Sequence, residues 1–215
     1  MSIRPSPQLA GDCMAPLLPV DYFLFDLDTA LLRTPWLELL AADSLVANTV
    51  RRLGAQARAG DIPPEWAVRQ QVALLGPMSA KRLRRAVDAA EAEPRVLSFI
   101  CAHPQRCVLI STAPEQWCEE LTARLPGSCY GSQARVAPGG ALQLTAVLDK
   151  KAVVTDLPGS VCAVGGSASD LGMLSAAHVS VAYGALHTPP VGLYDVITHL
   201  TFDPERLCQF LSELS

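Results

Sequence analysis

Two aspartates separated by one residue are the first groups in the chain that could do chemistry. Asp26 and Asp28 come directly after an apolar run, residues 21–25, that reads DYFLF. A carboxylate in this position can attack phosphorus, and a second carboxylate nearby can protonate a leaving oxygen. Such a pair also occurs in ordinary polar loops, so its meaning depends on the polar residues found later in the chain.

Three further groups of polar residues follow later in the chain. Ser111 and Thr112 precede a predicted helix with a proline in its first turn, where hydroxyls and free amides can bind a phosphate. Simple N-capping of that helix is the alternative. Lys150 and Lys151 supply ammonium groups, and Asp170 lies in a loop of small residues. This order of acids, hydroxyls, lysines and a last acid favours a phosphate-handling site.

Short apolar runs alternate with helical patterns, which is typical of a parallel sheet wound by helices. The predicted strands cover residues 21–25, 107–110, 161–164, 179–183 and 195–198. The carboxyl ends of parallel strands meet at one edge of the sheet, so polar groups placed after these strands can gather into one site. Residues 133–145 alternate around a Pro-Gly-Gly turn and predict a β-hairpin.

The long gap between the first two strands predicts an inserted helical cap. One apolar helical face extends from Trp36 to Leu53 and ends at Gly54, a second ends before Gly76, and Ser79 can cap a third helix. The expected division of the chain is a loose leader at 1–20, an α/β core at 21–34 and 101–215, and a helical cap at 35–100.

Composition narrows the class of protein and of partner. The chain has 215 residues, of which 50% are hydrophobic and 18% charged, enough to bury a sizeable core. A net charge of −4 leaves no basic excess for nucleic acid. No apolar run is long enough for a signal peptide or a membrane span. Seven cysteines without a C-x-x-C spacing suggest reduced thiols and a cytoplasmic protein.

Taken together, the polar clusters resemble the motifs of the haloacid dehalogenase superfamily, in its phosphoserine phosphatase branch, over about residues 20–200. The four motifs are Asp26-Leu27-Asp28, Ser111, Lys151-Ala152 and the segment GGSASDL at 165–171, which is similar to the family's G-D-G-A-N-D-L. The resemblance implies a Rossmann-like α/β core with a helical cap. It also implies hydrolysis of a small phosphorylated metabolite.

The resemblance assigns roles to matching positions. Asp26 would be the nucleophile that forms an aspartyl-phosphate, and Asp28 the general acid and then base. Ser111, with Thr112 beside it, would bind a phosphoryl oxygen. Lys151 would offset the negative charge gathered around Asp26.

The implied Mg²⁺ site is incomplete in this sequence. Asp26, the carbonyl of Asp28 and Asp170 would hold the ion, but Gly166 stands where the family has an aspartate that binds the metal directly. Mg²⁺ is commonly held by one or two carboxylates together with substrate phosphates. We therefore expect a weak or substrate-assisted metal site.

Other departures fall on substrate contacts. Ser169 replaces an asparagine that contacts substrate in the family, while Gln71 aligns with an arginine and Pro35 with a glutamate that hold the amino-acid part of phosphoserine. Without these charges phosphoserine is a poor substrate candidate. Ser169 and Gln71 remain candidate contacts for a different ligand.

The residues support three hypotheses. The first is a phosphomonoester hydrolase acting on a small phosphorylated metabolite other than phosphoserine. The second is a catalytically inactive or impaired relative that binds a phosphorylated ligand or a protein partner, because several family positions have changed together. The third, ranked last, is an enzyme in which Asp26 acts on a non-phosphate substrate.

Overall fold

The computed structural model describes residues 18–215. Of the leader expected at 1–20, only the last three residues fall within this range. Val20 is buried there, and its N–H donates to the Leu214 carbonyl at 2.9 Å. This end of the expected leader is therefore packed against the last helix.

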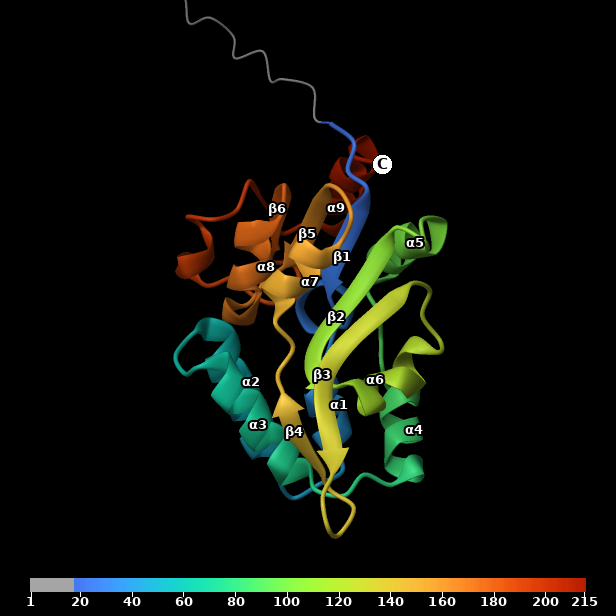
Figure 1. Cartoon of the computed structure of the whole chain (residues 1–215), viewed down its shortest axis with the longest axis vertical. Helices are drawn as coiled ribbons and strands as arrows, with labels where there is room; N and C mark the ends of the chain where they lie inside the picture. The colour runs from blue at the N-terminus through green and yellow to red at the C-terminus, as the bar shows by residue number, and fades with distance from the viewer. Residues whose placement is uncertain (1–17) are drawn as a thin grey trace, which may run out of the picture.

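A seven-stranded sheet in the order β4-β3-β2-β1-β5-β6-β7 runs through the described residues (Figure 1). Its strands are β1 (Tyr22–Asp26), β2 (Cys107–Pro114), β3 (Ser128–Val136), β4 (Leu142–Ala146), β5 (Val161–Gly165), β6 (Val179–Tyr183) and β7 (His199–Thr201). Neighbouring strands are parallel except β4, which pairs antiparallel with β3. The predicted parallel sheet and the predicted hairpin are confirmed.

Two strand predictions need correction. β2 continues past residue 110 to Pro114 with a bulge, so Ser111 and Thr112 lie within a strand and not at a helix N-terminus. The last strand is not residues 195–198, because Val196 and Ile197 pack into a hydrophobic cluster beside the sheet. The pairing with β6 begins only after them, at residue 199.

Helices cover both faces of the sheet. They are α1 (Trp36–Ala41), α2 (Ala47–Ala59), α3 (Pro64–Leu75), α4 (Ala80–Asp88), α5 (Pro94–Ala102), α6 (Glu115–Thr122), α7 (Lys150–Asp156), α8 (Leu171–Ala176) and α9 (Pro204–Glu213). Successive residues of β1 face opposite layers. Phe23 and Phe25 join the cluster that includes α5, α6 and α9, and Leu24 between them joins the cluster that includes α7 and α8. Burial of both faces explains the continuous apolar runs.

Helices α1 to α4, here called the cap, lie beyond the carboxyl ends of the central strands (Figure 1). The predicted single helix from Trp36 to Leu53 is wrong, because the chain leaves the helix after Ala41 and α2 then continues through Gly54. A side chain at residue 54 would meet the Gln71 amide nitrogen at 3.0 Å, so glycine lets α2 and α3 approach closely.

α5 falls inside the predicted cap range but packs with the core. Phe99 of α5 stacks edge-on against Phe23 of β1 at 5.0 Å between ring centres, and α5 also packs against α9. The helical layer over the site therefore ends with α4 in the structure.

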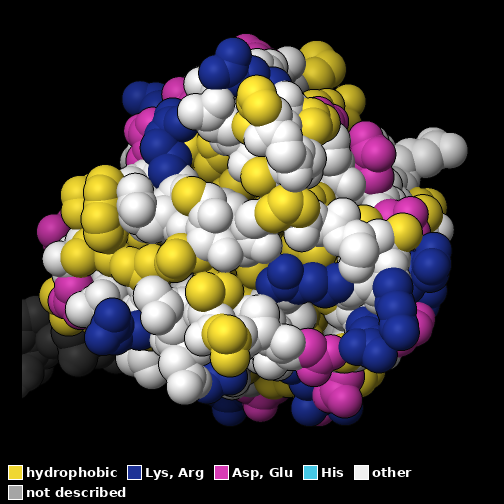
Figure 2. Space-filling view, turned by 90° about the horizontal axis from the view of Figure 1, so that it is seen from below, with side chains coloured by type: hydrophobic (Ala, Val, Ile, Leu, Met, Phe, Trp, Pro, Cys, Tyr) yellow, Lys and Arg dark blue, Asp and Glu magenta, His cyan; other side chains and the backbone are white. Residues whose placement is uncertain are grey.

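The face of the molecule at the cap end carries basic and acidic side chains intermingled with hydrophobic ones (Figure 2). On α4, for example, Arg85 pairs with Asp43 at 3.2 Å and Arg82 donates to the Leu40 carbonyl at 2.7 Å. Within the described part of the chain, no helix is long and apolar enough to cross a bilayer. The six cysteines of residues 18–215 are all free thiols.

Candidate functional site

The candidate site lies where the neighbouring parallel strands β1 and β5 end. Asp26 is the last residue of β1, and a single π-helical turn over Leu27–Leu31 comes after it. β5 ends at Gly165 and leads into the loop that carries Asp170. The pairing of the two strands brings these acids together from positions far apart in sequence.

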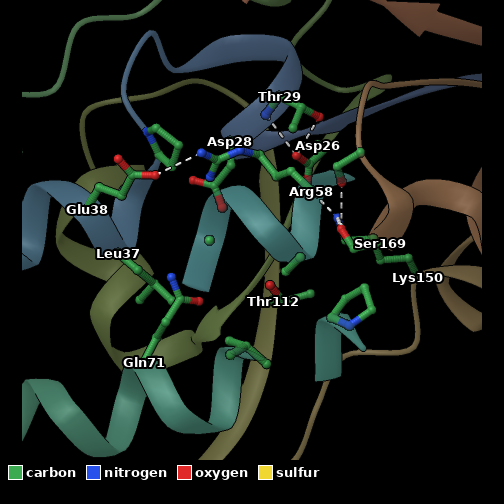
Figure 3. Close-up of a pocket in the computed structure, with 16 residues that line it drawn as sticks. Asp26, Asp28, Thr29, Leu37, Glu38, Arg58, Gln71, Thr112, Lys150 and Ser169 are labelled. Carbon is green, nitrogen blue, oxygen red and sulfur yellow. Dashed lines mark hydrogen bonds and ion pairs between the residues drawn. The ribbon is translucent and has the colours of Figure 1, made fainter. Parts of the chain in front are cut away.

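Both oxygens of Asp26 are held by hydrogen bonds. The Thr29 N–H and hydroxyl each donate to Asp26 Oδ2 at 2.8 Å, and Lys150 Nζ lies 2.5 Å from Asp26 Oδ1 (Figure 3). The side chain is only 2% exposed. Burial and the nearby charge of Asp170 raise the pKa of Asp26. The hydrogen bonds from Thr29 and Lys150 fix the carboxyl group in one orientation.

Asp170 is completely buried and faces Asp26. Its Oδ1 accepts from Lys150 at 2.6 Å, and its Oδ2 accepts from the N–H groups of Gly166 and Ser167 at 2.9 and 2.8 Å. Burial by itself would raise the pKa of Asp170, but the Lys150 charge and these hydrogen bonds outweigh it and lower the pKa. Asp170 is therefore an ionised carboxylate.

The lysine that reaches the acids is Lys150, so the prediction of Lys151 for this position is wrong. Lys150 is the first residue of α7 and is 5% exposed, whereas Lys151 is exposed. Consecutive helical residues point about 100° apart, so only one lysine of the pair can face Asp26. Burial would lower the pKa of Lys150, but Asp170 and Asp26 raise it, which keeps the ammonium charged.

Asp28 differs from the other two acids. Its Oδ1 accepts from the Trp36 N–H at 2.6 Å, and the side chain is only partly buried. Burial and the charge of Asp26 raise the pKa of Asp28 to about 7. At neutral pH both protonation forms are populated, which suits a general acid and base.

A small pocket lies between these core residues and the cap. Its volume is about 60 Å³, room for a few water molecules. It adjoins an outer cleft of about 410 Å³, with which it shares Thr112, Lys150 and Ser169. The exposed Lys151 lines that outer cleft. The inner pocket can take a group such as a phosphoryl, while the rest of a ligand would lie in the cleft or require the cap to open.

Three of the four predicted substrate contacts line the inner pocket: Thr112, Ser169 and Gln71. Ser111 lies elsewhere, fully buried in β2, with its hydroxyl accepting from the Ala113 N–H at 3.2 Å. Successive residues of a strand point to opposite sides, so Ser111 does not face the pocket that Thr112 lines. Thr112 takes the place that was predicted for Ser111.

Three pocket residues were missed by the sequence reasoning. Thr29 comes directly after the D-x-D pair and could have been found from that position. Glu38 and Arg58 come from the cap, and the nitrogen Nη2 of Arg58 donates to Oε1 of Glu38 at 3.0 Å (Figure 3). No sequence signal marks these two, because only the packing of α1 and α2 brings them over Asp28.

The donor set does not fit the Mg²⁺ ion that the sequence resemblance implies. All four oxygens of Asp26 and Asp170 already accept hydrogen bonds. A Cβ at Gly166 would lie 2.5 Å from the Tyr183 carbonyl oxygen, so a metal-binding aspartate has no room there. Among the described residues, no group of three or more His, Cys, Asp or Glu is arranged to hold a metal ion.

Solved structures of other proteins share this architecture. A phosphoserine phosphatase solved as a phospho-aspartyl intermediate analogue superposes with a TM-score of 0.73 at 15% identity, covering 90% of this chain and 99% of that one. The chain has the haloacid dehalogenase fold of the phosphoserine phosphatases. No protein-family model matches the sequence, and no curated protein matches it.

Other solved structures share the phosphoserine phosphatase fold. The phosphoserine phosphatase from T. onnurineus has a TM-score of 0.68 at 18% identity and covers 94% of this chain and 100% of its own. A HAD family hydrolase from Salmonella enterica has a TM-score of 0.70 at 18% identity, covering 86% of this chain and 68% of that one. At these identities the likeness establishes the fold and leaves the activity to the residues of the site.

Proposed function

We propose that the protein is a phosphomonoester hydrolase that acts on a small phosphorylated molecule through an aspartyl-phosphate on Asp26. One observation carries the proposal. Asp26 and Asp28 line the same small pocket, and burial together with the charge of Asp26 raises the pKa of Asp28 to about 7 while Lys150 holds Asp26 in place. Asp28 can therefore supply the proton that a leaving group needs, while Lys150 holds Asp26 in the fixed orientation of a nucleophile.

The chemistry is set by these positions. An Asp26 oxygen attacks phosphorus, the ester P–O bond breaks, and the leaving oxygen takes the proton of Asp28. Asp28, now ionised, takes a proton from a water molecule that attacks the same phosphorus and releases phosphate from Asp26. Lys150 offsets negative charge at Asp26 throughout. No step of this scheme requires a residue outside the described pocket.

The substrate class is indicated by the cap side of the pocket. The amide nitrogen of Gln71 donates to the Val50 carbonyl at 2.9 Å, and this side chain brings no charge to the pocket. Arg58 brings one positive charge and Glu38 one negative charge. The inner volume of about 60 Å³ suits the phosphoryl group alone. We expect a compact phosphate ester other than phosphoserine, and we expect the protein to act in the cytoplasm.

Hydrolysis of an aryl phosphate tests the proposal. Wild type should release phosphate, the Asp26→Asn variant should not, and mass spectrometry of a quenched reaction should find phosphate on the Asp26 peptide of wild type alone. Asp43→Asn, on the exposed face of the cap, is the matched control and should keep the wild-type rate. Equal rates for wild type and Asp26→Asn would refute the proposed nucleophile.

A second candidate is a protein that binds a phosphorylated ligand or a protein partner without turnover. The crowding at Gly166 and the hydrogen bonds on both oxygens of Asp26 favour it, because both restrain the reaction centre. In that case tungstate, a phosphate mimic, should bind to wild type with no hydrolysis of any ester. Loss of tungstate binding in Lys150→Met would locate the anion in this pocket.

A further inference from the structure

We propose that the Thr29 hydroxyl and the Lys150 ammonium together take the place of a divalent cation, so that the Asp26–Asp170 pair works without a resident metal ion. The inference deepens the proposed function and rests on it for its catalytic meaning alone, because metal binding can be measured whether or not the protein turns over. It starts from the way in which the two carboxylates face each other.

Each pair of facing oxygens is bridged by one group of this chain. Lys150 Nζ lies 2.5 Å from Oδ1 of Asp26 and 2.6 Å from Oδ1 of Asp170. The Thr29 hydroxyl lies 2.8 Å from Oδ2 of Asp26 and 3.1 Å from Oδ2 of Asp170. Mg²⁺ demands oxygens at about 2.0–2.1 Å in near-octahedral geometry. A divalent ion between either pair would have to displace the ammonium or the hydroxyl.

Thr29 is held in this position by several contacts. It is 1% exposed, its own N–H donates to Asp26 Oδ2 at 2.8 Å, and its hydroxyl accepts from the Gly166 N–H at 3.0 Å. A β-branched side chain has few alternative rotamers, so the hydroxyl cannot easily move aside. Thr29 is thus a built part of the site.

The loop after β5 is packed in a way that excludes a further acidic ligand. A Cβ at Gly166 would lie 2.5 Å from the Tyr183 carbonyl oxygen and 3.6 Å from the Thr29 Cβ. Real Cβ contacts of 2.5 Å to backbone essentially do not occur, so an aspartate at this position requires the loop or the end of β6 to shift. Glycine at position 166 and the placement of Thr29 therefore belong to one packing arrangement.

The charges of the buried groups also support the inference that no metal ion resides between the two acids. Two buried acids face one buried ammonium, which also donates to the Ser169 hydroxyl at the longer distance of 3.2 Å. Removal of Lys150 would leave two buried carboxylates with no countercharge. A metal ion should then become the favoured replacement.

Titration of the full-length protein with Mn²⁺, followed by the electron paramagnetic resonance signal of the free ion and by calorimetry, tests the inference. Wild type should show no stoichiometric binding into the millimolar range. Lys150→Met and Thr29→Ala should each bind Mn²⁺ at least about tenfold more tightly than wild type. Lys151→Met, the exposed neighbour on α7, is the matched control and should behave as wild type.

Two results would overturn the inference. One is binding of one Mn²⁺ per wild-type chain that Asp26→Asn abolishes, a measurement that needs no destabilised variant. The other is that Thr29→Ala and Lys150→Met fold but gain no Mn²⁺ binding. If Lys150→Met does not fold, the wild-type titration and the milder Thr29→Ala variant decide.

Hydrolysis with and without a chelator separates this inference from the proposed function. Aryl phosphate hydrolysis that persists in EDTA supports both. Hydrolysis that EDTA abolishes and Mg²⁺ restores would refute the inference and leave the phosphatase proposal standing. Absence of hydrolysis, together with absence of Mn²⁺ binding, would refute the phosphatase proposal and support the inference.

Discussion

The two walls of the pocket differ in how firmly their polar groups are held. On the core wall, Asp26 and Lys150 line the pocket, and the buried Asp170 contacts Lys150; all three are at most 5% exposed, and hydrogen bonds hold them in a single arrangement. On the cap wall, the Arg58 and Glu38 side chains are 21% and 9% exposed and depend mainly on each other. The core wall is therefore built for fixed chemistry, whereas the cap wall can exchange partners when a ligand enters.

The two walls should also differ in how well they tolerate substitutions. Removing one member of a buried ion pair leaves an uncompensated charge, but removing a partly exposed partner leaves a charge that water can solvate. Substitutions on the core wall should therefore change stability and chemistry together. Substitutions on the cap wall should change ligand affinity with little effect on folding.

After Asp26 itself, the largest effect is expected at Asp28, which lines the pocket beside it. Asp28→Asn should slow hydrolysis of an alkyl phosphate by about 10²–10⁴-fold, since loss of a general acid costs that much. An aryl phosphate, whose leaving group needs less protonation, should lose less. The ratio of the two rates, measured by phosphate release, checks this. Equal losses for both esters would argue against a general-acid role.

The pKa of Asp28 predicts how the rate of aspartyl-phosphate formation depends on pH. Burial and Asp26 raise the pKa of Asp28 to about 7, so the group holds its proton below pH 7 and loses it above. Formation of the aspartyl-phosphate from an alkyl ester should therefore fall as pH rises through 7, and this step should be flat in that range for Asp28→Asn. Single-turnover rates between pH 5.5 and 8.5, roughly spanning the transition, check it.

Breaking the core ion pairs should give the next largest effect. Lys150→Ala should destabilise the fold by about 3–5 kcal/mol, because Asp26 and Asp170 are then buried without a countercharge. Urea denaturation gives the free energy of unfolding. Lys151→Ala, exposed on the same helix, should change it by less than about 0.5 kcal/mol. Similar values for both lysines would contradict the assignment of Lys150.

A smaller loss is expected from crowding the core wall. Gly166→Ala places a Cβ 2.5 Å from the Tyr183 carbonyl oxygen and should cost about 1–3 kcal/mol of unfolding free energy. Gly192→Ala is the matched control, because a Cβ there meets nothing within 4 Å. Thermal and urea denaturation of both variants measure the difference. A neutral Gly166→Ala would show that this loop adapts freely.

The smallest effect on stability is expected on the cap wall. Arg58→Gln should change the free energy of unfolding by about 0–1 kcal/mol, because its pair with Glu38 is partly exposed. Tungstate affinity should nevertheless fall about threefold or more, since a nearby cation is lost. Arg51→Gln is the control: Arg51 lies 3.6 Å from the same Glu38 but is 63% exposed. Calorimetry with tungstate compares the two variants.

Much of the core was predictable because its signals are local. The apolar runs ending at Asp26 and near Gly165 predicted parallel strands, and both carboxylates were identified from the loops after them. The hairpin was predictable for the same reason, since alternation and a Pro-Gly-Gly turn act over few residues. Of the cap helices only the first was misplaced: the second ends before Gly76 and Ser79 caps the third as predicted, whereas the chain leaves the first helix after Ala41.

The site itself was predictable only in part. The resemblance selected Lys151 from the lysine pair, but Lys150 is the one that reaches Asp26, since the choice depends on where α7 begins. Alternation in β2 could not choose between Ser111 and Thr112, because the strand extends farther than its apolar run. Arg58 could not be predicted, because no local sequence pattern indicates which cap residue lies above Asp28.

The amino-acid sequence by itself determined which kinds of side chain are available to a site, since polar residues that follow the strands of a parallel sheet come to its carboxyl edge. Only the tertiary structure decided which of those groups meet and what lies between them. Whether a metal ion fits depends on where the Thr29 hydroxyl and the Lys150 ammonium lie and on the space beside Gly166, distances of a few ångströms between segments more than a hundred residues apart.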